Sequence, residues 1–542
     1  MILNPLRLAA GIAVFAAGLA APVAAQQTTV GLFLDDPRAY PGYTLFSPQT
    51  STSSYLIDNR GLLVHSWQGA STPGLGAYLL ENAHLLRTEK VSSAIFNAGG
   101  SGGKVRELDW DGLPLWDFTY ATSLHHQHHD VERLPNGNTL IIAWELKSRA
   151  EALTAGRAPA LVTAQGLWPD TIVEVQPTGP TSGTVVWEWH AWDHLIQDAD
   201  ATKGNYGTVA THAELIDLNF SAGSNADWIH LNSIDYNPLF DQILLSSHAF
   251  SEIWVIDHGT TTQQAAGHTG GARGRGGDLL YRWGNPQAYR AGAAADRKLF
   301  LQHDAQWTRP GDPGAGNITI FNNGQGRPGG NYSSVEELTP PVDASGSYSL
   351  VPGAPFGPAS ATWTYTAANL PDFYSMNIGG AQRLANGNTL ICDGTQGTFF
   401  EVTPAGETIW KYVNPVVSTG PLRQGDPITP GAGNLVFKIR RYDASLPGLM
   451  GRDLTPGFPV EGNPLIVYEA LRSAVADPSA PLGDALPLDP ARDLHTTATV
   501  SPIIIAGDGA PGSPPLVFYG IRNATYLRAS RQGSDVVLEF HY

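Results

Sequence analysis

The sequence predicts an all-β protein, a six-bladed β-propeller with long capping loops and an irregular C-terminal extension. One observation is a strand phrase that recurs in four segments. They read HHDVERLPNGNTLI from His128, HLNSIDYNPLFDQILLSSH from His230, QHDAQWTRPGDPGAGNITIFNNG from Gln302 and GGAQRLANGNTLICDG from Gly379. Another is the presence of 60 glycines and 40 prolines, clustered between short apolar runs. Repeated short strands joined by Gly- and Pro-rich turns favour a radial β architecture, in which equivalent strand ends meet at one axis.

A second phrase alternates with the first. It is an apolar strand, a polar turn with glycine, and a strand that ends in an aromatic residue, as in residues 55–67, 107–118, 172–189, 253–283 and 400–412. Each copy is typical of a hairpin, and the two phrases together supply about four strands, the size of one blade. The pairs predict six blades over about residues 30–440. We expect Trp67, Trp116, Trp187, Trp189, Trp283 and Trp410 to pack between neighbouring blades.

Insertions interrupt the repeat. Residues 191–227, 255–278 and 324–360 are polar or Gly-rich and are expected to be long loops that cap one face. The repeat is lost after residue 440. We therefore expect a catalytic propeller over residues 26–440 and, over 441–542, an extension that packs on the propeller or closes it.

The first 25 residues are typical of a signal peptide. Arg7 precedes an apolar run from Leu8 to about Ala21, and small residues lead up to Gln26, the expected first residue of the mature chain. The sequence thus predicts a periplasmic or secreted protein. Cys392 is the only cysteine, which excludes an internal disulfide. The net charge of −17 argues against nucleic acid and anionic membranes as partners.

Histidines are the main candidates for chemistry. The run HHQHHD, residues 125–130, raises the possibility of zinc, but it lacks a tight ligand spacing, and successive strand residues point to opposite faces; we predict no metal there. His125 and His126 are expected on a solvated loop. His129, His230 and His303 each stand before a strand at a comparable repeat position. They could converge at the axis together with Asn232.

These motifs carry a resemblance to a known family. HHDVERLPNGNTLI, DWIHLNSIDYNPLFDQILLSSHAFSEIWVIDH, QHDAQW…NITIFNNGQGRP and the opening PGYTLFSP…YLIDNRGLLVHSW are together similar to the bacterial arylsulfate sulfotransferases, over about residues 30–420. The resemblance implies an exported six-bladed propeller. It would move a sulfuryl group from a phenolic sulfate ester to a phenol, without PAPS, through a transiently sulfated histidine.

The resemblance also implies roles for single residues. His303, in QHDAQW, would be the nucleophile, with His129 and His230 as its partners. Asn232 would contact the sulfuryl oxygens, and Ser375 falls near a hydroxyl position of the family. His128 is a further candidate for substrate binding. At LLSSHAF the family usually has arginine where this chain has His248, which we count among the catalytic residues and which can bind sulfate strongly only when protonated.

Two other functions are compatible with the sequence. Water could replace the phenol acceptor, which would make the protein an arylsulfatase-like hydrolase, or a lyase could use the same scaffold. A non-catalytic binding propeller is the third possibility, although it would have no use for inward histidines. We expect no cofactor and, as partners, only the small-molecule phenolic sulfate donor and the phenol acceptor.

Overall fold

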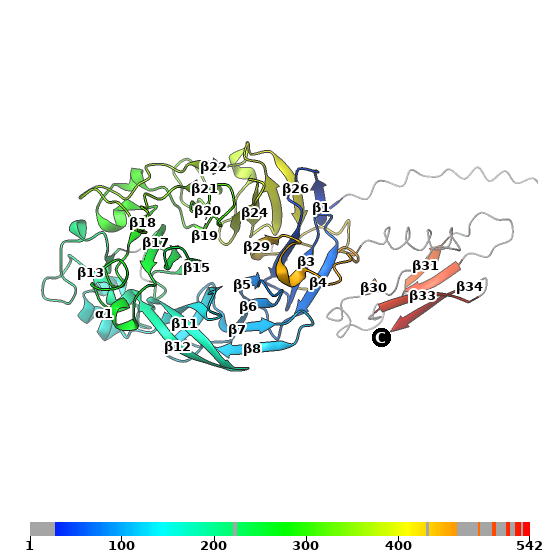
Figure 1. Ribbon diagram of the computed structural model, residues 1–542, viewed down its shortest axis with the longest axis horizontal. Coiled ribbons are helices and arrows are strands. Elements are labelled where there is room, and N and C mark those ends of the chain that lie inside the picture. Colours follow the sequence, from blue (N-terminus) through cyan, green and yellow to red (C-terminus); the bar gives the residue numbers. More distant parts are fainter. Residues whose placement is uncertain are drawn as a thin grey trace, which may run out of the picture.

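Six four- or five-stranded antiparallel sheets form a ring in the computed structural model (Figure 1). The structure describes residues 28–220, 225–429 and 433–462, and beyond them the backbone of five strands. The predicted signal peptide, residues 1–25, lies outside the described residues and stays a prediction. Each sheet is one blade, with its first strand nearest the axis of the ring and its last strand at the rim. The predicted six-bladed propeller is therefore confirmed.

The first three blades come from the N-terminal part of the chain and one strand near residue 440. Blade 1 contains β29 (Val436–Tyr442), β2 (Tyr43–Pro48), β3 (Ser53–Ile57) and β4 (Leu63–Gln68). Blade 2 contains β5 (Pro73–Leu79), β6 (Leu85–Lys90), β7 (Gly103–Leu108) and β8 (Pro114–Thr119). Blade 3 contains β9 (His125–Arg133), β10 (Thr139–Glu145), β11 (Asp170–Gly179) and β12 (Ser182–His190).

The other three blades follow in chain order. Blade 4 contains β15 (Leu231–Asn237), β16 (Gln242–Ser247), β17 (Glu252–Asp257) and β18 (Tyr281–Trp283). Blade 5 contains β19 (His303–Trp307), β20 (Ile318–Asn322), β21 (Ser334–Leu338) and β22 (Trp363–Tyr365). Blade 6 contains β23 (Gly380–Arg383), β24 (Thr389–Asp393), β25 (Thr398–Val402), β26 (Thr408–Val413) and, at the rim, β1 (Gly31–Asp35).

The ring is closed at two radii. At the rim, β1 pairs antiparallel with β26, so the start of the described chain completes the last blade. At the axis, β29 pairs antiparallel with β2, so a strand from beyond residue 435 completes the first blade. Two independent closures join chain segments about 400 residues apart and leave the described ring without an open seam.

The repeated sequence phrases explain the blades. The NGN phrase forms the turn between the first and second strands: Leu134 N–H donates to Asn138 O across it, and Leu384 N–H donates to Asn388 O in blade 6. The middle residue of the blade 3 turn, Gly137, has φ +86°, a conformation that favours glycine. The second asparagine of each turn also donates to a glutamate of the third strand, from Asn388 Nδ2 to Glu401 Oε1 at 2.7 Å in blade 6.

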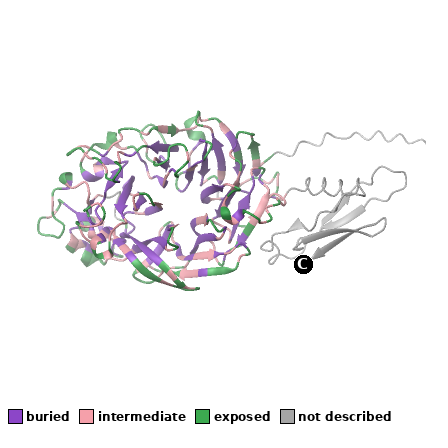
Figure 2. Cartoon of the chain, in the orientation of Figure 1, coloured by how far each residue is buried: buried purple, intermediate pink, exposed green. Residues whose placement is uncertain are grey.

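Tryptophans on the fourth strand of each blade link it to the next blade. In every blade an indole Nε1–H donates to the turn region between the third and fourth strands of the following blade. The pairs are Trp67 to Asp109 O, Trp116 to Ser182 O, Trp187 to Thr260 Oγ1, Trp283 to Pro358 O, Trp363 to Pro404 O and Trp410 to Asn59 O. The prediction that the repeated tryptophans pack between blades is confirmed, and Trp363 extends it to blade 5. Buried residues follow the inner strands, and exposed ones lie at the rim (Figure 2).

The insertions are mostly irregular, as expected. The segment between blades 3 and 4 carries the short parallel pair β13 (Leu195–Ile196) and β14 (Ile216–Asp217). Helix α1 (Arg149–Ala155) follows β10, α2 (Thr262–Ala265) follows β17, and β27 (Val416–Val417) pairs with β28 (Gly420–Pro421). The predicted loop over residues 324–360 is wrong in one part, because it contains β21. None of the helices in the described ranges is long and apolar enough to cross a membrane.

The chain after β29 returns to blade 1. Gly457 N–H donates to Leu63 O, Leu63 N–H donates to Phe458 O, and Leu449 is buried against the core of blades 1 and 2. Farther along, the backbone forms β30 (Leu486–Pro487), β31 (Ser501–Ile505), β32 (Leu516–Gly520), β33 (Tyr526–Gln532) and β34 (Asp535–His541). The rest of the predicted extension lies outside the described residues.

Candidate active site

The inner strands bring the predicted histidines to the axis. In blades 3 to 5, one residue of each inner strand accepts a backbone N–H of the next blade. Ile234 N–H donates to Asp130 Oδ2 at 3.3 Å, Ala305 N–H to Ser233 Oγ at 3.0 Å, and Ala381 N–H to Asp304 Oδ2 at 3.1 Å. These inter-blade bonds give the blades a common register around the axis.

That register corrects one expectation. The residues that precede the three acceptors are His129, Asn232 and His303, so these three occupy one repeat position. His230 stands two residues earlier in its blade and does not share it. The pairing of β9, β15 and β19 is broken by a β-bulge at this level. Because a bulge re-aims the side chains next to it, His230 reaches the other histidines from a different backbone position.

Four histidine rings form a continuous row. The ring centroids of His129 and His230 are 4.6 Å apart, those of His230 and His248 are 4.9 Å apart, and those of His248 and His303 are 5.2 Å apart. His129 and His303 are buried, whereas His230 keeps 18% of its side chain exposed. All four predicted catalytic histidines thus lie together, in blades 3, 4 and 5.

Asn323 fixes the orientation and tautomer of His303. The Nδ2 group of Asn323 donates to Ser375 O at 2.9 Å and to Ile378 O at 2.8 Å, so its Oδ1 atom must face His303. His303 Nδ1 lies 2.7 Å from that oxygen and therefore carries the proton that it donates. Nε2 of the neutral ring is left with its lone pair. Burial, opposed by the bond to Asn323, lowers the pKa of His303 to about 4.

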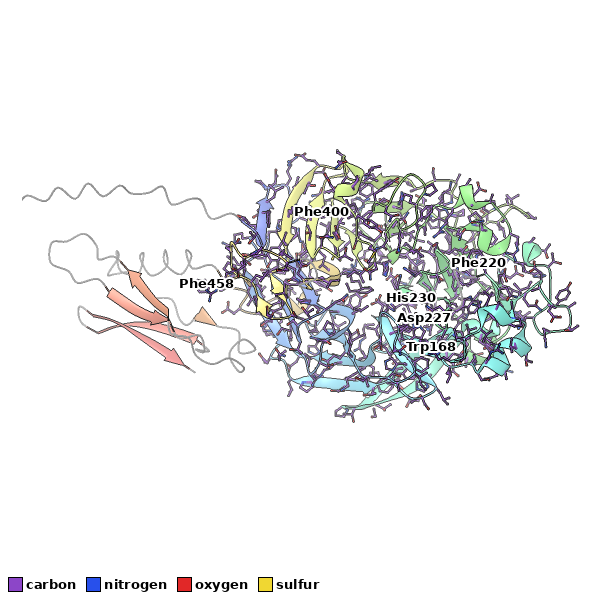
Figure 3. All side chains as sticks on the ribbon, turned by 180° about the vertical axis from the view of Figure 1, so that it is seen from behind. Trp168, Phe220, Asp227, His230, Phe400 and Phe458 are labelled. Atoms are coloured by element: carbon purple, nitrogen blue, oxygen red, sulfur yellow. The ribbon has the colours of Figure 1, made fainter. Side chains whose placement is uncertain are left out.

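His230 is in the opposite electrostatic state. Its Nδ1 atom lies 2.5 Å from Oδ2 of Asp227, its neighbour in Figure 3. Trp144 Nε1–H donates to the other carboxylate oxygen of Asp227 at 2.9 Å. Burial alone would lower the pKa of His230, but the Asp227 carboxylate more than offsets it, so the pKa lies above the ordinary value. The row therefore pairs a neutral imidazole, His303, with one that is readily protonated.

His129 is held by neighbours on two sides. Its Nδ1 atom lies 2.8 Å from Nδ1 of His128, whose Nε2 atom lies 2.8 Å from Asp170 Oδ1. On the other side is Gly100, which has φ +86° and whose missing Cβ atom would lie 1.9 Å from Cε1 of His129. Burial and the neighbouring imidazoles hold the pKa of His129 well below its usual range. The His129 ring therefore occupies the space that a side chain at position 100 would need.

The other predicted substrate-binding residues have supporting positions. His128 is fully buried and stacks on Trp144, with ring centroids 4.0 Å apart. Ser375 is also fully buried; its Oγ donates to Asn377 O, and its carbonyl accepts from Asn323. Asn232 Nδ2 donates to Gln302 O at 2.7 Å, while its Oδ1 has no partner among the described residues.

His248 stands between His230 and His303. Burial and these two imidazoles hold the pKa of His248 well below its usual value. It follows β16, and its backbone N–H donates to His230 O at 3.1 Å. At neutral pH it is therefore an uncharged donor or acceptor, unlike the arginine that the sequence resemblance leads one to expect here.

Apolar residues from the remaining blades complete the surroundings of the row. Leu75, Ile378 and Phe437 form a small buried cluster from blades 2, 6 and 1. The ring of Phe437 lies 5.9 Å from the ring of His129 and 6.1 Å from that of His303, between centroids. One side of the axis is thus polar and the other is apolar, an arrangement suited to a ligand with an anionic and an aryl end.

A buried charge network lies directly beside the histidines. Lys438 Nζ contacts Asp130 Oδ2 at 2.6 Å and Asp304 Oδ1 at 3.3 Å, and Arg440 Nη2 donates to Asp304 Oδ1 at 2.7 Å. Asp130 and Asp304 are the residues that follow His129 and His303. Lys438 therefore ties together the strands of blades 3 and 5 that carry His129 and His303, and Arg440 adds a second cation on the blade 5 side.

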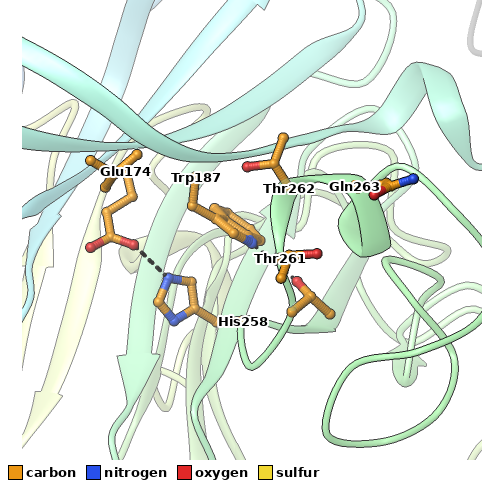
Figure 4. A pocket seen from close by; sticks show the side chains of 8 residues that line it. Glu174, Trp187, His258, Thr261, Thr262 and Gln263 are labelled. Atoms are coloured by element: carbon orange, nitrogen blue, oxygen red, sulfur yellow. Dashed lines mark hydrogen bonds and ion pairs between the residues drawn. The ribbon is translucent and has the colours of Figure 1, made fainter.

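A surface hollow of about 610 Å³ lies away from this cluster, between blades 3 and 4 (Figure 4). Glu174, Trp187 and His258 line it together with residues 260–263. His258 lies between Asp241 and Glu174, and although burial opposes it, these carboxylates raise its pKa to about 9. None of the predicted site residues lines this hollow, so it does not bear on the histidine row.

The sequence analysis missed several residues of the site. Asn323 and Asp227 orient His303 and His230, and Gly100 limits the position of His129. The first two stand in segments that the sequence singled out, FNNG and DWIH, but nothing in either segment shows which histidine they meet. The expectation that His125 and His126 are solvated is wrong: both belong to β9, and His126 is fully buried.

No curated protein matches the chain, and the solved structures that match it are only distantly similar. Among solved structures, a protein of unknown function from Bacteroides caccae is 12% identical, with a TM-score of 0.39 over 74% of this chain and 99% of its own. A periplasmic gluconolactonase from Pseudomonas aeruginosa is 10% identical, with a TM-score of 0.35 over 72% of this chain and 87% of its own. At TM-scores this low, neither protein says anything about the chemistry.

The match to a protein family is much more extensive. The family model of the arylsulfotransferases (ASST) matches residues 36–420, which include all six blades apart from the two closing strands, β1 and β29. All four histidines of the row lie inside the matched range. The substrates implied by the family are small: an aryl sulfate donor and a phenol acceptor. The chain therefore belongs to the arylsulfotransferase (ASST) family and is an arylsulfate sulfotransferase enzyme.

Proposed function

We propose that the enzyme transfers the sulfuryl group in two steps, through a covalent intermediate on Nε2 of His303. The observation that carries this proposal is the hydrogen bond from His303 Nδ1 to Asn323 Oδ1. It leaves the lone pair of Nε2 free, and the lowered pKa of about 4 keeps the ring neutral at neutral pH. A neutral imidazole with a free lone pair is the nucleophilic form of histidine.

In the first step, Nε2 of His303 attacks the sulfur atom and the bond from sulfur to the phenolic oxygen breaks. The positive charge that develops on the His303 ring is shared with its Nδ1–H, which donates to the Asn323 amide oxygen. The departing phenolate takes a proton from Nε2 of protonated His230. Asp227 stabilises that protonated state, because its carboxylate accepts from Nδ1 of the same ring.

The second step reverses the first with a new phenol. His230, now neutral, removes the phenol proton as the phenolic oxygen attacks the sulfur atom, and Nε2 of His303 leaves. The sulfuryl oxygens stay negatively charged throughout, so N–H donors around them lower the barrier. His129 and His248 flank His230 and can supply such donors. One site that serves both half-reactions implies ping-pong kinetics.

A paired assay tests this proposal. The wild type is given a chromogenic aryl sulfate with and without a phenol, beside His303→Ala and a control, His84→Ala. His84 contacts Glu107 at 2.8 Å in blade 2, away from the row. We expect acceptor-dependent release that His303→Ala abolishes and His84→Ala retains. Acceptor-independent release would indicate a sulfatase, and binding without release would indicate a non-catalytic propeller. Release that survives in His303→Ala would overturn the assignment of the nucleophile.

A further inference from the structure

Three potential metal ligands, from the insertion between blades 3 and 4 and from an insertion within blade 4, meet outside the histidine row. His194 follows a short 3-10 turn, Ala191–Asp193, just before β13, which Figure 1 shows at the rim of the ring. His268 and Asp278 come from the segment between β17 and β18. One ligand atom from each of the three lies within 4.8 Å of the other two. Two insertions that are distant in the sequence thus present two imidazoles and a carboxylate to one point.

The hydrogen bonds of His194 point its Nδ1 lone pair at this place. Its Nε2 atom lies 2.8 Å from Ala265 O, which can only accept, so Nε2 carries the proton of the neutral ring. Its Nδ1 atom then faces Asp278 Oδ1 at 2.8 Å, and Nδ1 of His268 lies 2.8 Å from the same oxygen. At these distances the lone pairs of the nitrogen atoms and of Asp278 Oδ1 repel one another, unless a proton or a metal ion lies between them.

The surroundings match those of a metal site. A ligating histidine normally donates its other N–H to a carbonyl or carboxylate, as His194 does to Ala265 O. Trp189 stacks on His194, with planes 6° apart, and donates to Gly277 O, next to Asp278. His194 and Asp278 are buried, whereas His268 is 57% exposed, so an ion could reach the site from solvent.

We propose that His194 Nδ1, His268 Nδ1 and Asp278 bind a divalent transition-metal ion, with zinc as the best fit. Two imidazole nitrogens and one carboxylate suit zinc, which binds such ligands at about 2.0–2.2 Å in a tetrahedron with edges of about 3.3 Å. Small side-chain movements would widen the two separations of 2.8 Å to about that size and bring the two imidazole nitrogens to the same spacing, and water supplies the fourth ligand. The ion fastens the insertion of blade 4 to that of blade 3. This site is separate from HHQHHD, where the sequence argues against zinc.

Zinc binding to the untagged, EDTA-treated and dialysed protein tests the proposal by calorimetry. We expect one zinc per chain, binding at least about 10-fold weaker in His268→Ala, since losing only an outer-shell partner already costs that much. Asp278→Asn should weaken zinc binding to a similar extent. Zinc at about 100 times its wild-type Kd should raise the Tm of the wild type by about 3 °C, and that of His268→Ala by about half as much at most.

Two controls locate the ion. His84→Ala removes a histidine that contacts Glu107 and Asn82 in blade 2, and it should bind zinc as the wild type does. His303→Ala should also retain binding; if it loses zinc while His268→Ala keeps it, the ion belongs to the axial row and the proposal fails. It is likewise overturned if the wild type binds no zinc, or if His268→Ala, which changes an exposed side chain, binds with unchanged affinity.

Discussion

Replacing Asn323 by alanine tests how His303 is prepared for attack. The substitution removes the acceptor of His303 Nδ1–H and two donors, to Ser375 O and Ile378 O. At about 1 kcal/mol for each hydrogen bond, the free energy of unfolding should fall by about 3 kcal/mol. In the variant, His303 Nδ1–H has no acceptor when positive charge develops on the ring. The loss of a buried donor's partner costs about 1–3 kcal/mol, and an increase of that size in the activation free energy lowers kcat/KM by about 5- to 150-fold. Chemical denaturation and steady-state kinetics measure the two effects.

The pH profile separates this role from general destabilisation. His303 attacks only as the neutral imidazole. The value of kcat/KM should therefore fall as the pH falls through the folded pKa of His303, which is about 4. The bond to Asn323 raises this pKa against the lowering effect of burial, so its loss in Asn323→Ala should move the acid limb to lower pH. The chain also offers a matched control. Asn322 is equally buried; its side chain accepts from Phe300 N–H and donates to Lys298 O, with a long third bond of 3.5 Å to Glu336 Oε1, and it has no hydrogen bond to His303.

Asn322→Ala should therefore lose about 2 kcal/mol of stability and keep the acid limb in place. Wild-type kcat/KM in Asn323→Ala would refute the reasoning. So would an acid limb that moves to higher pH, or one that moves by the same amount in both variants.

Three further substitutions test the rest of the row. Asp227→Asn removes the carboxylate that raises the pKa of His230, so the alkaline limb of kcat/KM should move to lower pH; an unmoved limb would exclude His230 as the acid. His248→Arg places a permanent cation beside His230, so the pKa of His230 should fall and the alkaline limb should move to lower pH; an unchanged pH–rate profile would show that position 248 does not act on His230 through its charge. Gly100→Ala places a methyl group 1.9 Å from the ring of His129 and should lower kcat by about 100-fold; it should also lower the Tm, because alanine is strained at φ +86°, and full activity would show that His129 is dispensable.

The blade count was predictable because the repeat is local. Each NGN turn and each tryptophan-ended strand is recognisable from about fifteen consecutive residues, and the tryptophan-ended hairpin recurs in most of the blades. The two closing pairs were not predictable in this way, since β1 and β29 acquire their partners from segments about 400 residues away. β21 was missed because its short run, Ser334–Leu338, carries two glutamates inside a polar insertion.

The candidate site was predictable at the level of residue type. Histidines next to inner strands were expected to approach the axis once the propeller was inferred, and His129, His230 and His303 do, joined by His248 from the end of a second strand. Their individual roles depend on partners that come from other blades or loops. Asn323 belongs with His303 only because Ser375 and Ile378 orient its amide, and Gly100 reaches His129 across a blade boundary. Such contacts have no signature in one sequence.

Trapping the intermediate is the most direct test of the central claim, that His303 carries the sulfuryl group. The enzyme is incubated with an aryl sulfate donor alone, and its intact mass and peptide masses are compared with those of His303→Ala. We predict that the wild type gains the mass of one SO₃ group on the peptide with His303, and that a phenol then removes it. No gain in the wild type, or a gain on another histidine that persists in His303→Ala, would contradict the account.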